Sequence, residues 1–204
     1  MKLRRSKTMK NMEDIVRQYS AHEWEPEKGR TAVLLIDLQE YFRGIIDPIL
    51  GNIVHLASAI RKTDIPLLFT QHGHAPGEDH GMLGRWWPDL IMEGNDEARL
   101  IPELKAGEVS PIIPKNTYSA FHETGLEKKL RDMGVTDLVI GGVMTNLCCE
   151  TTARDAFVRN FRVFFLADGT STVSEEFHLA ALKNLGYGFA ALLTCEQATA
   201  YLRG

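Results

Sequence analysis

The sequence is poor in cysteine and carries no strong excess of either charge. Only three cysteines occur, Cys148, Cys149 and Cys195. An odd number with two adjacent residues excludes a disulfide framework and predicts a reducing, cytoplasmic compartment. Lys and Arg number 23 against 27 Asp and Glu, which gives a net charge of −4. This balance argues against nucleic acid as a partner.

Long hydrophobic runs are also missing. The apolar run at residues 32–36 is among the longest, far short of the ~20 residues that span a bilayer, so we expect no membrane partner. Five Lys and Arg in the first ten residues precede no apolar segment, which predicts a solvated arm rather than a signal peptide. The length of 204 residues predicts one domain over 31–204, preceded by an arm and short helix over 1–30.

Several common catalytic motifs are absent. There is no Walker A loop, no Gly-x-Ser-x-Gly elbow, no His-Glu-x-x-His pair and no Cys-x-x-Cys pair. Gly186-Tyr-Gly188 leads from a predicted helix into a predicted strand, which is the wrong context for a dinucleotide-binding loop. These absences argue against dehydrogenases and nucleotide kinases, and we expect no cofactor.

The hydrophobic pattern predicts strands and helices that alternate along the chain. Continuous apolar runs predict strands at 32–36, 66–69, 111–113, 137–140, 162–166 and 189–193. Apolar residues spaced along one face predict helices at 9–19, 53–60, 126–133, 145–159, 177–185 and 195–202. The alternation predicts an α/β fold, a single three-layer α/β/α sandwich with a mainly parallel six-stranded sheet. Ligand chemistry is then expected at the carboxyl ends of the strands.

The strongest chemical signal follows the fourth predicted strand. Gly141-Gly142 leaves that strand, and after a tight loop Cys148 lies at the start of a helix with Thr145 as its expected N-cap. The helix dipole and free N–H groups there favour a thiolate and would stabilise an oxyanion. The alternative is that Cys148 is a small hydrophobic residue in a core helix.

Two charged residues close other predicted strands. Asp37 ends the first strand and Lys115 ends the third, so in a parallel sheet both share an edge with Cys148. Lys115 would lower the pKa of the thiol, and Asp37 would accept its proton and return it to a leaving group. Considered singly, Asp37 could cap a helix and Lys115 could be a solvated loop residue.

The three residues lie in motifs that resemble those of the isochorismatase-like cysteine hydrolases. Asp37 stands in Leu-Leu-Ile-Asp-Leu-Gln-Glu-Tyr-Phe, Lys115 in Pro-Lys-Asn-Thr-Tyr-Ser-Ala-Phe and Cys148 in Gly-Val-Met-Thr-Asn-Leu-Cys. The resemblance runs from about residue 30 to the C-terminus and implies an Asp-Lys-Cys triad on a six-stranded parallel sheet. It also implies a cis peptide between Val143 and Met144, in an oxyanion loop that includes Thr145, and a homodimer or homotetramer.

Nicotinamidases of this superfamily carry a metal site, written Asp-x-His with a later His after Trp-Pro. Here His72 stands in place of the aspartate and Leu90 in place of the later histidine, while His74 is retained. A metal moved to His72, His74 and His80 would fit no regular ligand spacing, so we expect none. The alternative is that these histidines line the pocket or face solvent.

The retained cysteine favours an acyl or C–N substrate, because many true isochorismatases lack it. The motif Thr-Asn-Leu-Cys resembles the corresponding motif of ureido, carbamoyl and amide hydrolases more than that of nicotinamidases. We therefore expect a cysteine-dependent hydrolase of a small non-peptide amide or ureido substrate that acts through a thioester. Two alternatives stay open: a vinyl-ether hydrolase that uses Asp37 as acid, and a non-enzymatic protein with Cys148 and Cys149 as a redox pair.

The small-molecule substrate is expected to contact aromatic and polar residues on the loops around Cys148. These are Gln39, Phe42, His72, Trp86, Trp87, Tyr118 and Phe121. Trp86 and Trp87 could equally pack at a subunit interface. Cys149 is expected in helix packing, Cys195 as inert, and Asp155 and Asp168 as structural residues.

Overall fold

The structure is a computed structural model that describes residues 11–107 and 110–203. Its centre is a six-stranded sheet in the order β3-β2-β1-β4-β5-β6, with every neighbouring pair parallel. The strands are β1 (Thr31–Ile36), β2 (Leu67–His72), β3 (Ile112–Lys115), β4 (Asp137–Val143), β5 (Arg162–Ser171) and β6 (Ala191–Leu193). The order changes direction between β1 and β4, which is the position where doubly wound sheets open a crevice for ligands.

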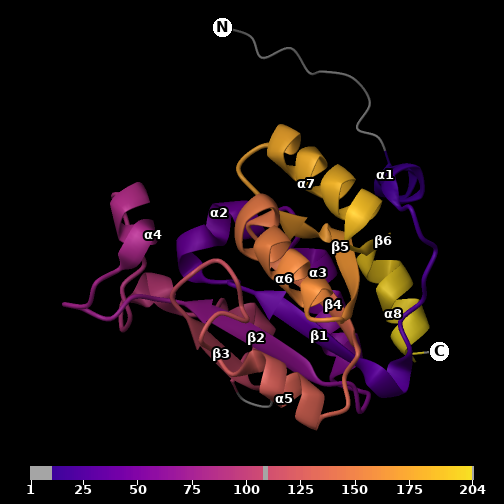
Figure 1. Cartoon of the computed structure of the whole chain (residues 1–204), viewed down its shortest axis with the longest axis horizontal. Coiled ribbons are helices and arrows are strands. Elements are labelled where there is room, and N and C mark those ends of the chain that lie inside the picture. Colours follow the sequence, from indigo (N-terminus) through magenta and orange to yellow (C-terminus); the bar gives the residue numbers. More distant parts are fainter. Residues whose placement is uncertain (1–10, 108–109, 204) are drawn as a thin grey trace, which may run out of the picture.

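Helices cover both faces of the sheet, which confirms the predicted three-layer α/β/α sandwich (Figure 1). One layer contains α1 (Met12–Tyr19), α5 (Leu126–Asp132), α6 (Glu150–Val158) and α7 (Glu175–Gly188). The other contains α2 (Arg43–Ile46), α3 (Leu50–Ile60) and α8 (Cys195–Arg203). Alternate residues of β1 enter the two cores: Leu34 packs in the first and Leu35 in the second. A strand buried on both faces must be apolar throughout, which explains its uninterrupted hydrophobic sequence.

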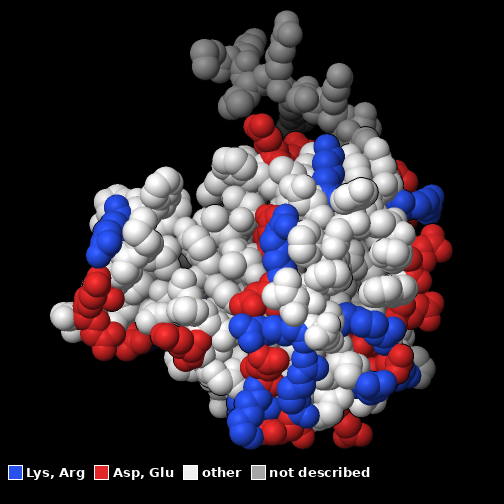
Figure 2. All heavy atoms as spheres, in the orientation of Figure 1, with Lys and Arg blue, Asp and Glu red and all other residues white. Residues whose placement is uncertain are grey.

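The segment between β2 and β3 has little regular structure. It contains α4 (Gly81–Trp86) and the short turns η3 (Asp96–Ala98) and η4 (Pro102–Leu104); two similar turns, η1 (Lys28–Arg30) and η2 (Glu40–Phe42), flank β1. Figure 1 shows α4 on an arm that projects from the body of the domain. Charged side chains crowd the surface around α5, whereas the surface between the α4 arm and the body is largely uncharged (Figure 2).

Some element boundaries differ from those expected. Strand β5 continues to Ser171 instead of ending at Leu166, because a register shift between Ile140 and Gly142 of β4 lets it resume pairing. The helix expected from 145 begins as a π-helical turn, η5 (Thr145–Cys149). Met133 and Phe177, expected on buried helix faces, are 40% and 51% exposed, because α5 ends before Met133 and Phe177 lies in the first turn of α7.

The N-terminal helix is attached to the domain. Ile15 and Val16 of α1 enter the first core, as their spacing predicts, and the Ala21 N–H donates to the Gly186 carbonyl. The solvated arm expected over the first ten residues lies outside the described residues. Among those described, no helix combines the length and apolar character needed to cross a membrane.

Candidate active site

Asp37 leaves the carboxyl end of β1 in a left-handed conformation, with φ of 49°. The Thr70 hydroxyl of β2 holds it from the side: it donates to Asp37 Oδ1 at 2.6 Å and accepts from the Asp37 N–H at 3.1 Å. Both residues are fully buried. Asp37 Oδ2 contacts the Lys115 ammonium at 2.7 Å, and since a carboxylate oxygen has two lone pairs, one is left that can receive a proton.

Lys115, the last residue of β3, joins the other two groups. Its Nζ lies 2.7 Å from Asp37 Oδ2 and 3.5 Å from Cys148 Sγ, and it donates to the Thr117 carbonyl at 2.7 Å. The side chains of Lys115 and Asp37 are both fully buried. The structure therefore brings together the carboxylate, the ammonium and the sulfur that the sequence places at three separate strand ends.

The loop that carries Cys148 follows β4. Gly142 has φ of 118°, and a Cβ there would lie 2.1 Å from the Ile36 carbonyl oxygen, so only glycine lets β4 pass this close to β1. The Val143–Met144 peptide is cis, as the resemblance implies. Thr145 is not the N-cap: Met144 takes that position, and the Thr145 hydroxyl contacts His178 instead.

The thiol of Cys148 is not acidic in the resting site. Burial raises its pKa to about 12; the Lys115 charge lowers it, but the Asp37 charge raises it again. The charge of Lys115 lowers the pKa of the thiol, as expected, but burial raises this pKa by more. Burial lowers the pKa of Lys115, but the charges of Asp37 and Cys148 more than compensate and raise it. The resting site therefore holds the Lys115 ammonium beside Asp37, with a neutral thiol at Cys148.

Cys148 opens onto a largely apolar cavity of about 370 Å³. Of the residues expected around the substrate, Phe42, His72, Trp87 and Tyr118 line it. The other lining residues are Tyr41, Ile45, Leu83, Asp89, Leu90, Ile91, Met144, Leu147, Cys148 and Val173. Two hydrogen bonds cross its rim: Tyr41 donates to Asp89 at 2.9 Å, and the Trp87 indole donates to the Tyr118 hydroxyl at 2.8 Å.

Three residues expected to touch the substrate do not line this cavity. Gln39 is fully buried. Its side-chain amide donates to the carbonyls of His72 and Ala98 and accepts from the His72 N–H. Phe121 packs in the first core beside Phe161. Trp86 lies on the α4 arm, is 72% exposed and lines a neighbouring cavity instead. The sequence predicts Gln39 and Phe121 at the substrate only because both lie close to catalytic motifs along the chain. Closeness along the chain does not show in which direction a side chain points.

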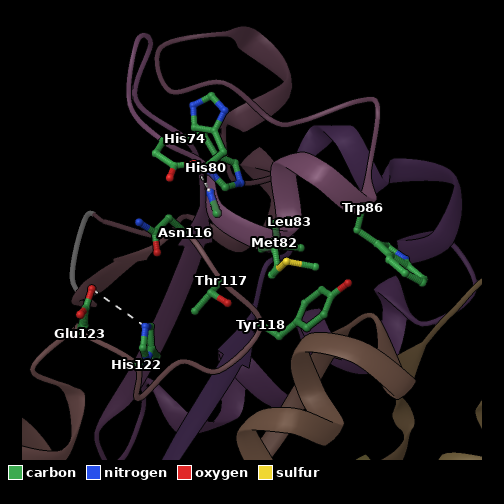
Figure 3. A pocket seen from close by; sticks show the side chains of 12 residues that line it. His74, His80, Met82, Leu83, Trp86, Asn116, Thr117, Tyr118, His122 and Glu123 are labelled. Carbon is green, nitrogen blue, oxygen red and sulfur yellow. Dashed lines mark hydrogen bonds and ion pairs between the residues drawn. The ribbon is translucent and has the colours of Figure 1, made fainter.

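A second cavity of about 580 Å³ lies beside the first, with Leu83 and Tyr118 in the walls of both. Figure 3 shows that its wall is formed by the α4 arm and the loop after β3. His74, His80 and Trp86 line it. His72 and His74 connect the two cavities through an Nε2–Nε2 contact of 3.2 Å.

The histidines do not fit a metal ion. The described residues contain no group of three or more His, Cys, Asp or Glu placed to hold one. His72 Nδ1 faces the Lys115 ammonium at 3.5 Å and its Nε2 faces His74. Burial, followed by the charge of Lys115, lowers the pKa of His72 to about 4. This imidazole is neutral, and both of its nitrogens face other side chains.

Two contacts of the site were missed from the sequence. Thr70, which holds Asp37, is an ordinary strand residue in sequence, and its only signal is its place near the end of β2. The contact between Thr145 and His178 joins residues 33 positions apart, so no local sequence pattern predicts it.

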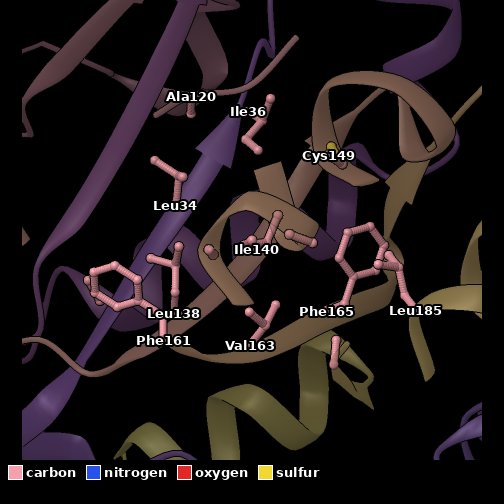
Figure 4. Packing of buried hydrophobic residues seen from close by; sticks show 14 of the residues in the cluster. Leu34, Ile36, Ala120, Leu138, Ile140, Cys149, Phe161, Val163, Phe165 and Leu185 are labelled. Carbon is pink, nitrogen blue, oxygen red and sulfur yellow. The ribbon is translucent and has the colours of Figure 1, made fainter. Parts of the chain in front are cut away.

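The other residues singled out in the sequence are structural. Cys149 is fully buried in the first core with Ile140 and Phe165 (Figure 4). Cys195 is buried, and burial followed by the charge of Asp168 raises its thiol pKa. Asp155 pairs with Arg159 at 2.8 Å, and Asp168 accepts the Cys195 N–H.

Comparison with known proteins gives a consistent result. The family model described as the isochorismatase domain matches residues 31–197. "Nicotinamidase 3" of Arabidopsis thaliana is 42% identical over 191 residues, covering 92% of this chain and 96% of the relative. "Ureidoacrylate amidohydrolase RutB" of Pseudomonas savastanoi pv. phaseolicola is 30% identical over 189 residues, 77% of each chain. The expectation of a greater likeness to ureido hydrolases than to nicotinamidases is therefore not supported.

Solved structures share the fold. A cysteine hydrolase from Pseudomonas syringae pv. phaseolicola superposes with a TM-score of 0.84 at 25% identity, over 88% of this chain and 95% of that one. The two chains thus share the fold over most of their lengths.

Proposed function

The chain belongs to the isochorismatase family and is a hydrolase, and from that premise we propose that it cleaves the C–N bond of a small carboxamide through a thioester on Cys148. The observation that carries the proposal is the contact of Lys115 Nζ with both Asp37 Oδ2 and Cys148 Sγ, beside a cavity open to the sulfur. A buried carboxylate next to a neutral thiol is a general base next to its nucleophile.

In the first half of the reaction, Cys148 Sγ forms a bond to the amide carbon while its proton passes to Asp37 Oδ2. The N–H groups of the loop formed by Val143, Met144 and Thr145 are proposed to stabilise the oxyanion. The C–N bond then breaks, and the proton held by Asp37 goes to the leaving nitrogen, which departs as ammonia. Because the pKa of Cys148 is about 12, proton transfer must accompany attack.

In the second half, water replaces ammonia. Asp37 takes a proton from that water, whose oxygen bonds to the thioester carbon. The S–C bond breaks, the carboxylic acid leaves, and the proton returns to the sulfur. Lys115 remains an ammonium throughout and compensates the charge that moves between Asp37 and Cys148.

The proposed substrate is a small aromatic primary carboxamide, with nicotinamide as the first candidate. A cavity of about 370 Å³ lies at the small end of the ~300–1,000 Å³ typical of ligand pockets. Its aromatic wall, from Phe42, Trp87 and Tyr118, suits a flat ring. The 42% identity to a nicotinamidase over nearly the whole chain supports the same class.

The test is ammonia release from nicotinamide and from a ureido acid by wild type, Cys148→Ala, Asp37→Asn and the control Cys195→Ala. Both site variants are expected to lose turnover with their fold intact, whereas Cys195→Ala keeps it. If Cys148→Ala still releases ammonia while Asp37→Asn does not, water attacks the amide carbon directly and the thioester route is wrong.

We also propose that the chain assembles as a homodimer or homotetramer. Met82 and Trp86 lie one turn apart on the α4 arm and are 66% and 72% exposed, so we infer that a second copy of the chain covers them. Light scattering on wild type and on Met82→Glu/Trp86→Glu measures the assembly; a monomeric wild type contradicts the proposal.

A further inference from the structure

The loop that carries Cys148 is tied by two side-chain links to the chain after β5, one in the segment that leads to α7 and one in the first turns of α7 itself. The Thr145 hydroxyl lies 2.9 Å from His178 Nδ1, and the Thr172 hydroxyl donates to Asn146 Oδ1 at 2.6 Å. The links therefore hold two consecutive residues at the start of η5, and Cys148 follows within the same turn.

The contact between Thr145 and His178 is buried at its Thr145 end. Thr145 is fully buried, so its hydroxyl has no water to replace the imidazole if that partner is removed. His178 is itself held by the first turn of α7, where its N–H donates to the Ser174 carbonyl and the Ser174 hydroxyl accepts from the Phe177 N–H. The ring thus projects from a fixed helix start, not from a loose loop.

The contact between Thr145 and His178 fits a neutral imidazole. When the ring proton lies on Nε2, the unprotonated Nδ1 accepts a hydrogen bond from the Thr145 hydroxyl. Burial lowers the pKa of His178, against the Ala167 hydrogen bond and the charge of Glu175, which favours this neutral form.

We propose that His178 is a positioning residue, which acts through Thr145 to hold the oxyanion loop and Cys148 in the geometry that attacks the amide. This inference rests on the proposed function. His178 does not line the catalytic cavity, so it is placed to affect the rate of the chemical step more than the binding of substrate. Loop N–H groups stabilise an oxyanion only if they are held in place before the reaction.

The test compares His178→Leu, His178→Asn and Thr145→Val. Asn carries its side-chain oxygen on Cγ, where histidine carries Nδ1, so it restores an acceptor for Thr145. We expect His178→Leu and Thr145→Val each to lower kcat about tenfold with KM within about twofold, the size of one lost buried hydrogen bond. His178→Asn should recover most of the rate. His55→Leu makes the same change at an exposed position of α3 and should leave both constants unchanged.

A second readout separates this inference from the proposed function. The alkylation rate of Cys148 by iodoacetamide needs no substrate, and it should fall about fivefold in His178→Leu and Thr145→Val and recover in His178→Asn. If wild type cleaves no amide, the proposed function fails and the alkylation rates still decide the role of His178. Rates for His178→Leu within twofold of wild type in both assays, or an Asn variant as slow as the Leu variant, would overturn the proposal.

Discussion

Replacement of Thr70 by valine tests how far the catalytic carboxylate depends on one neighbour. The substitution keeps the shape of a buried side chain and removes the hydroxyl that donates to Asp37 Oδ1 at 2.6 Å and accepts from its N–H at 3.1 Å. Asp37 would lose the partner that fixes the direction of its carboxylate, while Lys115 Nζ still lies beside Oδ2 at 2.7 Å.

A hydrogen bond to a charged group contributes ~1.5–3 kcal/mol. If all of it is needed in the transition state, kcat/KM falls ~10-fold to ~150-fold, since ~1.4 kcal/mol corresponds to a factor of ten. The unfolding free energy should fall by a similar ~1.5–3 kcal/mol, because the Asp37 oxygen loses a donor and stays buried.

The assay is steady-state ammonia release beside urea denaturation. Thr70→Ser retains the hydroxyl and should keep most of the activity. Thr199→Val is a matched control, since Thr199 is also buried but its hydroxyl donates to the Cys195 carbonyl in α8. If Thr70→Val loses no more kcat/KM than Thr199→Val, Thr70 does not orient the base and the reasoning is refuted.

Three further predictions concern the thiol, the loop and the histidines. Because burial raises the pKa of Cys148 to about 12, its alkylation without substrate should rise ~tenfold per pH unit between about pH 7 and 9, and a plateau in that interval would show a more acidic thiol. Gly142→Ala should destabilise the fold by more than ~3 kcal/mol in urea denaturation, because its Cβ would overlap the backbone of β1; Gly44→Ala, with open space around it, should not. Dialysis against a chelator, with metal content measured, should leave kcat unchanged because both nitrogens of His72 face other side chains, whereas a loss that is restored by zinc or iron would contradict that assignment.

The fold could be predicted because parallel sheets impose a simple pattern. The strand β1 is buried on both faces, so residues 32–36 are apolar without interruption, and the same rule reveals β4. Parallel strands end at one edge of the sheet, which is why Asp37, Lys115 and Cys148 could be expected to converge although they are far apart in sequence.

The features that could not be predicted depend on contacts between distant residues. The pKa of Cys148 is set by burial, which outweighs the nearby Lys115, and the sequence shows the charge but not the burial. Gln39 has a polar side chain next to a catalytic motif, yet its amide donates hydrogen bonds to the backbone carbonyls of His72 and Ala98. Side-chain direction in loops follows from such tertiary contacts and not from spacing along the chain.

Rapid-quench mass spectrometry of the intact protein with nicotinamide tests the central claim most directly. The account predicts an adduct on Cys148 whose mass equals the substrate less ammonia, which forms and decays at rates compatible with kcat and is absent in Cys148→Ala. Turnover by wild type without any such adduct, or an adduct mapped to Cys149 or Cys195, would contradict a thioester at this triad.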